Sequence, residues 1–186
     1  MMEIKALLLK EHSKAVTSVI VSYILKHPEK IEELMDCFFD SNSRICQRAA
    51  WPVGILGEKN PEIIMSYLPK LITNLKEPKH DAITRNTVRI WQKMKIPENL
   101  QGEVFELCFN FILNPKIAIA IRAFSMTACA NIAKDIPELR EELILAISDQ
   151  LENATPGDVY KRQDPGSYNK TQKPDMLLVI ETHILS

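Results

Sequence analysis

The dipeptide Pro-Glu recurs at a spacing close to the length of one helical hairpin, and this repeat constrains the fold more than any other feature. The four copies are Pro28-Glu29, Pro61-Glu62, Pro97-Glu98 and Pro137-Glu138, which are 33, 36 and 40 residues apart. Proline at the first helical position costs no hydrogen bond, and a following acid favours the positive end of the helix dipole. Each copy therefore predicts the start of a helix in an array of repeats.

An apolar stripe follows each Pro-Glu at the spacing of an amphipathic helix. The stripes are Ile31, Leu34, Met35 and Phe38; Leu68, Leu71, Ile72 and Leu75; Val104, Leu107, Cys108 and Phe111; and Leu139, Leu143, Ile144 and Ile147. A short polar turn and a second helix come after the first three of them. One such hairpin cannot bury its stripe alone, so stacked neighbours must build a continuous core.

The predicted second helices share a basic residue near their beginning: Arg44, Arg85 or Arg122. Asp40 and Asp81 each precede the arginine by four residues, where the acid can cap the helix or pair with the arginine. We interpret Arg122 as a structural charge, paired with an acid such as Glu103 or Glu106, because its helix is apolar nearly all round.

Two prolines depart from the repeat pattern. Pro52 lies inside a predicted second helix, where we expect a kink. Pro69 indicates that the helix predicted over residues 62–76 is bent or starts late.

Composition agrees with an all-α protein. The 186 residues include only five glycines and 6% aromatic residues, and the chain is rich in leucine, isoleucine, alanine, lysine and glutamate, which lose little rotamer freedom in a helix. With 23 basic and 24 acidic residues, no global charge steers the protein towards nucleic acid or anionic lipid.

The recurring order is Pro-Glu, an apolar helix, an Asp turn, and then a helix in which an arginine is followed by small residues, as in Arg48-Ala49-Ala50-Trp51 and Arg122-Ala123. This pattern resembles the HEAT-repeat family over roughly residues 13–151. The resemblance implies a right-handed α-α superhelix, or solenoid, of about four HEAT-like hairpins over residues 1–157. The stretches "CQRAAWPVGILGEKNPE" and "FELCFNFILNPKIAIAIRAFSM" are similar to small bacterial HEAT-like proteins, some of which carry the name adenylosuccinate lyase. Enzymes of that superfamily are much longer and have a signature loop with Ser-Ser, Met-Pro, Lys and Asn, which has no counterpart here.

The repeat pattern breaks after the fourth Pro-Glu helix, near Leu151. Residues 158–163, "DVYKRQ", resemble a one-frame translation of the mosaic-end oligonucleotide used in transposase-based library preparation. We interpret residues 158–186 as an irregular tail that arose as a sequencing chimera. The alternative is a native linker followed by a short helix or strand over residues 175–185.

No catalytic, cofactor-binding or metal-ligating constellation is evident in the sequence. The four cysteines, Cys37, Cys46, Cys108 and Cys129, are far apart in apolar segments and read as reduced core residues. The histidines, His12, His27, His80 and His183, lie at predicted helix ends or in the tail. The apolar run near the start is too short for a secretory signal, and residues 117–133 are interrupted by Arg122. We expect a cytoplasmic protein without a membrane span or cofactor.

A binding surface is the remaining hypothesis for function. The second helices of a HEAT array line its concave face, and we expect that face to bind a protein or peptide. The candidate binding residues are Arg44, Arg48, Trp51, Arg85, Arg89 and Lys93. Tryptophan and arginine supply many interface hot spots. The alternative is DNA binding, because HEAT-like glycosylases for alkylated bases hold the phosphate backbone with such residues, although the same arginines could instead form an Asp-Arg ladder between repeats. We assign Trp91 to the core.

Overall fold

A computed structural model describes residues 3–134 and 136–152, without the side chains of 149–152. These residues form ten α-helices and one 3-10 helix, and this part of the chain contains no strand. The all-α prediction is therefore confirmed. The chain divides into two compact units, unit 1 up to Lys95 and unit 2 from Ile96 onward.

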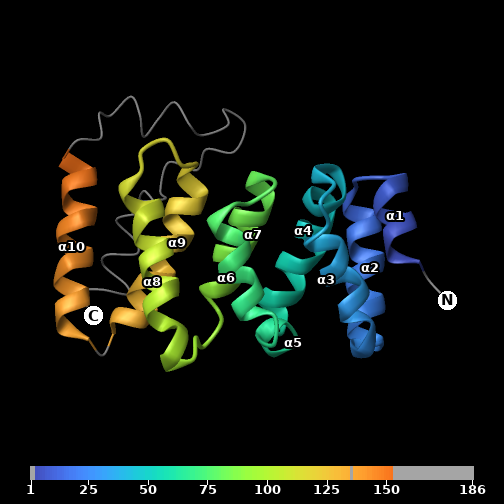
Figure 1. Cartoon of the computed structure of the whole chain (residues 1–186), viewed down its shortest axis with the longest axis horizontal. Helices are drawn as coiled ribbons and strands as arrows, with labels where there is room; N and C mark the ends of the chain where they lie inside the picture. The colour runs from blue at the N-terminus through green and yellow to red at the C-terminus, as the bar shows by residue number, and fades with distance from the viewer. Residues whose placement is uncertain (1–2, 135, 153–186) are drawn as a thin grey trace, which may run out of the picture. The chain divides into compact units, whose positions relative to one another are not determined.

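Unit 1 consists of three helical hairpins (Figure 1). The first pairs α1 (Ile4–Lys10) with α2 (Lys14–Lys26), and the second pairs α3 (Ile31–Phe38), which follows the 3-10 turn η1 (Pro28–Lys30), with α4 (Ser43–Lys59). The third pairs the short α5 (Glu62–Met65) and α6 (Leu68–Lys76) with α7 (Asp81–Trp91). First helices pack on first helices, as α1 does on α3, and second helices pack on second helices, as α2 and α7 do on α4.

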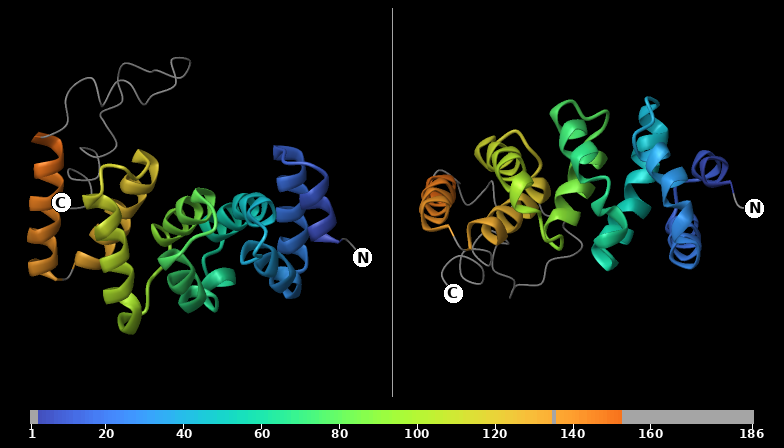
Figure 2. Two further views of the ribbon diagram at one scale, coloured as in Figure 1. Left: turned by 45° about the horizontal axis from the view of Figure 1, so that its top comes forward. Right: turned by 60° about the horizontal axis from the view of Figure 1, so that its bottom comes forward.

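Unit 2 repeats the plan with one complete hairpin in the described residues. Helix α8 (Glu98–Leu113) packs along α9 (Ile119–Ala133), and α10 (Pro137–Glu152) packs on both (Figure 2). Ten residues of α9 are buried, as its nearly continuous apolar character predicts. Buried Arg122 donates from Nε to the carbonyl oxygen of Ile112 at 3.1 Å. Its side chain therefore links α9 to α8 within the core. Its predicted pairing with Glu103 or Glu106 stays a prediction.

Every Pro-Glu stands at the start of a helical element. Pro28 opens η1, Pro61 and Pro97 immediately precede α5 and α8, and Pro137 is the first residue of α10. The apolar stripes face the core, and the stripe of α6 is buried at all four predicted positions. The first-helix predictions are therefore confirmed.

Three features of unit 1 refine the sequence interpretation. The hairpin of α1 and α2 precedes the first Pro-Glu and was not predicted from that dipeptide. Pro69 occupies the first turn of α6, so the predicted single helix is split into α5 and α6. Pro52 lies inside α4, which continues helical through it from Ser43 to Lys59.

The predicted aspartate caps are wrong. Helix α4 is capped by Asn42, whose side chain accepts from the backbone N–H of Arg44 at 3.0 Å. Helix α7 is capped by His80, whose Nδ1 accepts from the N–H of Ala82 at 3.0 Å. Asp40 lies further back, where it accepts from the N–H of Asn42 and pairs with Lys5 of α1. Neither aspartate stands at the cap position, because Asp40 lies two residues before the cap of α4 and Asp81 is already the first residue of α7.

The predicted tail, residues 158–186, and the boundary after residue 157 lie outside the described residues, as does His183. Over residues 3–134 and 136–152, none of the helices combines the length and apolar character needed to cross a bilayer.

Candidate protein-binding surface

One side of helix α4 faces away from the core. The buried residues of α4 include Cys46, Ala49, Ala50 and Val53, which occupy one side of the helical wheel. The opposite side holds Arg44, Arg48, Trp51, Ile55 and Glu58, at the three-and-four spacing of a single stripe. Arg85 and Arg89 form the corresponding stripe of α7, and Val19 lies opposite the core on α2. We call these eight residues the second-helix face of unit 1.

Arg48 forms hydrogen bonds within unit 1. Its Nη1 donates to the carbonyl oxygens of Leu8 at 2.6 Å and Leu9 at 3.0 Å. Both carbonyls belong to the last turn of α1, where intrahelical partners are missing and the helix dipole is negative. The half-buried Arg48 therefore caps α1 from a neighbouring helix.

Arg89 also has an internal partner. Its guanidinium forms an ion pair with the carboxylate of Glu58 on α4, and both side chains are about a third exposed or less. The pair links neighbouring second helices at the edge of the second-helix face. The pair is a contact between repeats of the kind expected for an Asp-Arg ladder. Its acid, however, is a glutamate near the end of α4 instead of a turn aspartate.

Trp51 is half-buried and lies beside a histidine. The ring of His12, from the segment between α1 and α2, meets it at a centroid distance of 5.7 Å and an interplanar angle of 82°. This edge-to-face contact fixes the indole, while part of it stays exposed. The other tryptophan, Trp91, is only 1% exposed, so its assignment to the core is confirmed.

Three of the candidate cations are exposed: Arg44, Arg85 and Lys93. Within the described part of the chain, no carboxylate lies within ion-pair distance of their side chains. Lys93 follows the end of α7 at Trp91, so its predicted place within the helix is wrong. Arg44 and Arg85 can each form charge-assisted hydrogen bonds with an external acid without breaking an internal contact.

Two glycines set the spacing of α4 and α7. A Cβ atom added at Gly54 would collide with the amide oxygen of Asn86, and one at Gly57 would lie 2.5 Å from Cγ1 of Ile90. Close approach of the backbones therefore depends on the missing side chains. The pairing of residue 54 with 86 and 57 with 90 also places Arg85 at the level of the turn between Trp51 and Ile55.

The structure thus divides the six predicted residues into three groups. Arg48 and Arg89 are used inside unit 1, whereas Arg44, Arg85 and Lys93 are exposed, and Trp51 is shared between packing and surface. Sequence reasoning missed His12, Glu58 and the two glycines. The spacing Gly54-x-x-Gly57 inside a helix was the available signal for close packing, while the partners of Arg48 are main-chain groups that no side-chain motif reveals.

Metal-ligating side chains and cysteine thiols can be located throughout the described residues. These residues contain no group of three or more metal-ligating side chains that could hold an ion. All four cysteines are free and buried, as predicted. Burial raises the pKa of the Cys37 thiol to about 11 and raises that of Cys129 well above its usual value, so both thiols stay protonated and unreactive near neutral pH. The surface can act through shape and charge.

The fold and this surface define a helical-repeat protein with a two-layered unit of stacked hairpins. The sequence matches the HEAT repeat domain family over residues 4–158, and the chain belongs to that family. This match confirms the HEAT-repeat resemblance and extends it to include α1. Comparison with the curated proteins and with the solved structures gave no significant match.

Proposed function

We propose that this protein is a non-enzymatic scaffold that binds a protein or peptide partner through the second-helix face of unit 1. HEAT-repeat arrays commonly act in protein interactions, and stacked repeats provide an extended surface for them. The observation that carries the proposal is the presence of Arg44, Arg85 and a partly exposed Trp51 on adjacent helices. Arginine and tryptophan combine large contact area with directional hydrogen bonds.

The alternative proposal, DNA binding, is weakened by the same geometry. Two of the five candidate cations, Arg48 and Arg89, already have internal partners. Fewer cations free to neutralise phosphates mean less of the counterion release that dominates affinity for DNA. The surface keeps apolar area at Ile55 and Val19, and Val19 is 52% exposed, which suits a peptide better than a phosphate backbone.

Affinity capture from the source cells tests the proposal with a matched pair of double variants. Arg44→Glu combined with Arg85→Glu reverses the two exposed arginines. Lys116→Glu combined with Lys134→Glu makes the same change in net charge at exposed positions of unit 2. The proposal expects wild type and the unit 2 variant to retain the same protein, and the Arg44/Arg85 variant to lose it.

Retention of that protein by all three chains would show that the second-helix face of unit 1 is not the binding surface. Salt-sensitive retention on double-stranded DNA, lost in the Arg44/Arg85 variant, would favour the nucleic-acid alternative instead.

A further inference from the structure

Charge is unevenly distributed between the two helix layers of unit 1. The second helices α2, α4 and α7 contain seven basic and two acidic residues. The first-helix elements α1, η1, α3, α5 and α6 contain five of each. The formal net charge of the whole chain is only −1, so the excess of positive charge is local to the second helices.

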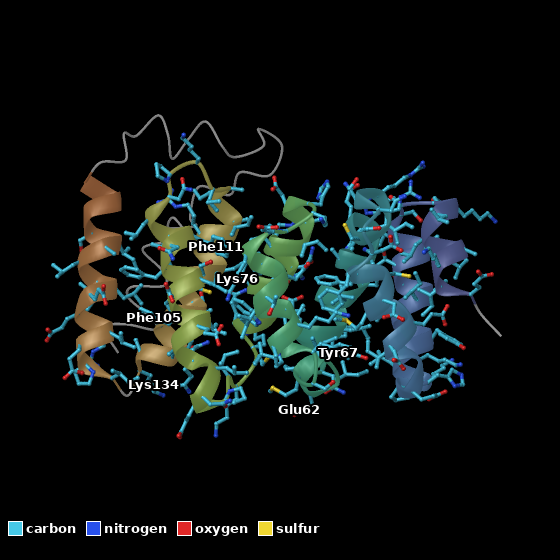
Figure 3. The ribbon with its side chains drawn as sticks, viewed as in Figure 1. Glu62, Tyr67, Lys76, Phe105, Phe111 and Lys134 are labelled. Carbon is cyan, nitrogen blue, oxygen red and sulfur yellow. The ribbon has the colours of Figure 1, made fainter. Side chains whose placement is uncertain are left out.

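The first-helix side has no such excess of positive charge, and acidic residues lie close to one of its tyrosines. Tyr67, at the start of α6 (Figure 3), has its pKa raised by burial and, to a smaller extent, by the negative charges of Glu32 and Asp36 on α3. These acids lie on exposed positions of the first-helix layer. Of the two helix layers, only the second helices carry an excess of positive charge, so a negatively charged ligand is favoured on the second-helix side of unit 1.

Most basic residues of the second helices are exposed and can meet a ligand. Arg89 and Glu58 neutralise each other, and Arg48 is bonded to the end of α1. The remaining basic residues of these three helices are exposed: Lys14, Lys26, Arg44, Lys59 and Arg85. Asp81, at the start of α7, is the only other acid on them.

Apolar surface lies among these charges. Because residue 54 of α4 faces residue 86 of α7, Arg85 lies beside the turn that carries Trp51 and Ile55. Val19 is exposed on the neighbouring α2. A ligand that spans the three helices would meet Val19 on α2, then Trp51 on α4 and then Arg85 on α7.

We infer that the partner segment recognised by the second-helix face is an acidic peptide with interspersed apolar or aromatic side chains. A carboxylate pairs with Arg85, and a second one with Arg44, while an apolar side chain packs on Trp51 and Ile55. Helices packed about 10 Å apart make the three-helix span about 20 Å, which an extended segment of about six to eight residues covers. This inference rests on the proposed function and specifies its partner.

The test uses fluorescence anisotropy with labelled synthetic peptides and the full-length protein. The acidic probe alternates glutamate with leucine and phenylalanine, and its control has glutamine in place of every glutamate. Single-stranded and double-stranded DNA oligonucleotides of equal charge are further probes. Because Trp91 is buried, a change in tryptophan emission on binding reports on Trp51.

We expect the acidic probe to bind and the glutamine control to bind at least about 10-fold more weakly. Arg85→Glu and Trp51→Leu should each weaken the acidic probe by about 10-fold or more, as expected for hot-spot residues. Lys116→Glu, in unit 2, should leave its affinity within about twofold, and added salt should weaken binding by screening.

Equal binding of the acidic and glutamine probes, or no effect of Arg85→Glu, would overturn the inference. Tighter binding of DNA than of the acidic probe, with the same sensitivity to Arg85→Glu, would overturn it in favour of a nucleic acid. If the acidic probe fails while affinity capture still depends on Arg44 and Arg85, the partner has another chemistry and the proposed function survives. If capture does not depend on them either, both proposals fail.

Discussion

Helix α4 packs against α1 on one side and α7 on the other, and the two junctions depend on different kinds of contact. Towards α1, the contact of α4 is polar and lies at a helix end, because Arg48 donates to the carbonyl oxygens of Leu8 and Leu9. The other end of α1 is bonded by Glu33 of the paired α3, which accepts from the N–H of Ile4 at 2.8 Å. Towards α7, the contact depends on Gly54 and Gly57, where side chains are absent and Asn86 and Ile90 fill the space.

Helix length explains the difference. Helix α1 has seven residues and buries only Ile4 and Leu8, so most of its backbone groups are end groups that need outside partners. Helix α7 has eleven residues and buries seven of them, so packing supplies most of its contact with α4, and the Arg89–Glu58 pair adds one polar link. An arginine on α4 is therefore bonded at the first junction, whereas Arg85 on α7 is left exposed.

The largest effect expected of a single substitution is steric and lies at the α4–α7 junction. Gly57→Ala should destabilise unit 1 by about 1–2 kcal/mol, because overpacking against Ile90 outweighs the gain of about 1 kcal/mol in helix propensity. Equilibrium unfolding followed by tryptophan fluorescence measures this change, since both tryptophans, Trp51 and Trp91, lie in unit 1.

Gly102→Ala is the matched control. Gly102 lies inside α8, and an added Cβ would meet nothing within 4 Å. The same substitution should therefore stabilise unit 2 by about 0.5–1 kcal/mol, as followed by calorimetry. If both substitutions shift stability in the same direction, the steric account of the α4–α7 junction is wrong.

The next effect concerns the polar junction. Arg48→Ala should cost about 1.5 kcal/mol, because two charge-assisted hydrogen bonds to the end of α1 are lost from a half-buried side chain. Amide hydrogen exchange should accelerate first in α1. Arg44→Ala, one turn earlier on the same stripe, should change stability by less than about 0.5 kcal/mol. Equal losses would remove the distinction between the two arginines.

The smallest effect is the pH dependence of the Lys5–Asp40 pair, whose Nζ–Oδ2 distance is 2.8 Å. The hydrogen bond from Lys5, and then that from the N–H of Asn42, hold the pKa of Asp40 below its usual value. A carboxyl whose pKa is lowered by folding stabilises the fold above its unfolded pKa of about 3.9 and loses this contribution as the pH falls through the folded pKa.

Asp40→Asn isolates the charge in this pair. The variant should be less stable than wild type at pH 7, and the difference should close in acid, as measured by urea unfolding at a series of pH values. A difference that stays constant down to the lowest pH would show that the charge of Asp40 does not contribute.

The sequence was sufficient for the helices that follow each Pro-Glu, but it was insufficient for the hairpin of α1 and α2 and for the bonding partners of individual side chains. Pro-Glu and the apolar stripes predicted first helices because local propensity and packing agree there. The caps at Asn42 and His80 were missed because several polar residues compete within each turn, and small shifts of the helix start decide between them. The split at Pro69 was anticipated, since proline fits only the first turn of a helix.

The candidate surface was predicted as a set of residues but not as a division of roles. Periodicity places Arg44, Arg48 and Trp51 on one side of α4, and the structure agrees. It cannot show that Arg48 meets main-chain carbonyls 40 and 39 residues away, or that Arg89 meets Glu58. Such partners are set by how neighbouring helices end and pack, which depends on tertiary structure.

Unfolding of two matched double variants tests the division of roles most directly. Arg48→Glu with Arg89→Glu and Arg44→Glu with Arg85→Glu make the same change in net charge on the same two helices. The bonded arginines predict a loss of about 2–4 kcal/mol for the first variant. The exposed arginines predict a change within about 0.5 kcal/mol for the second, because an acid is favourable in the first turn of α4. Equal losses in the two variants would contradict the claim that Arg44 and Arg85 are free for a partner.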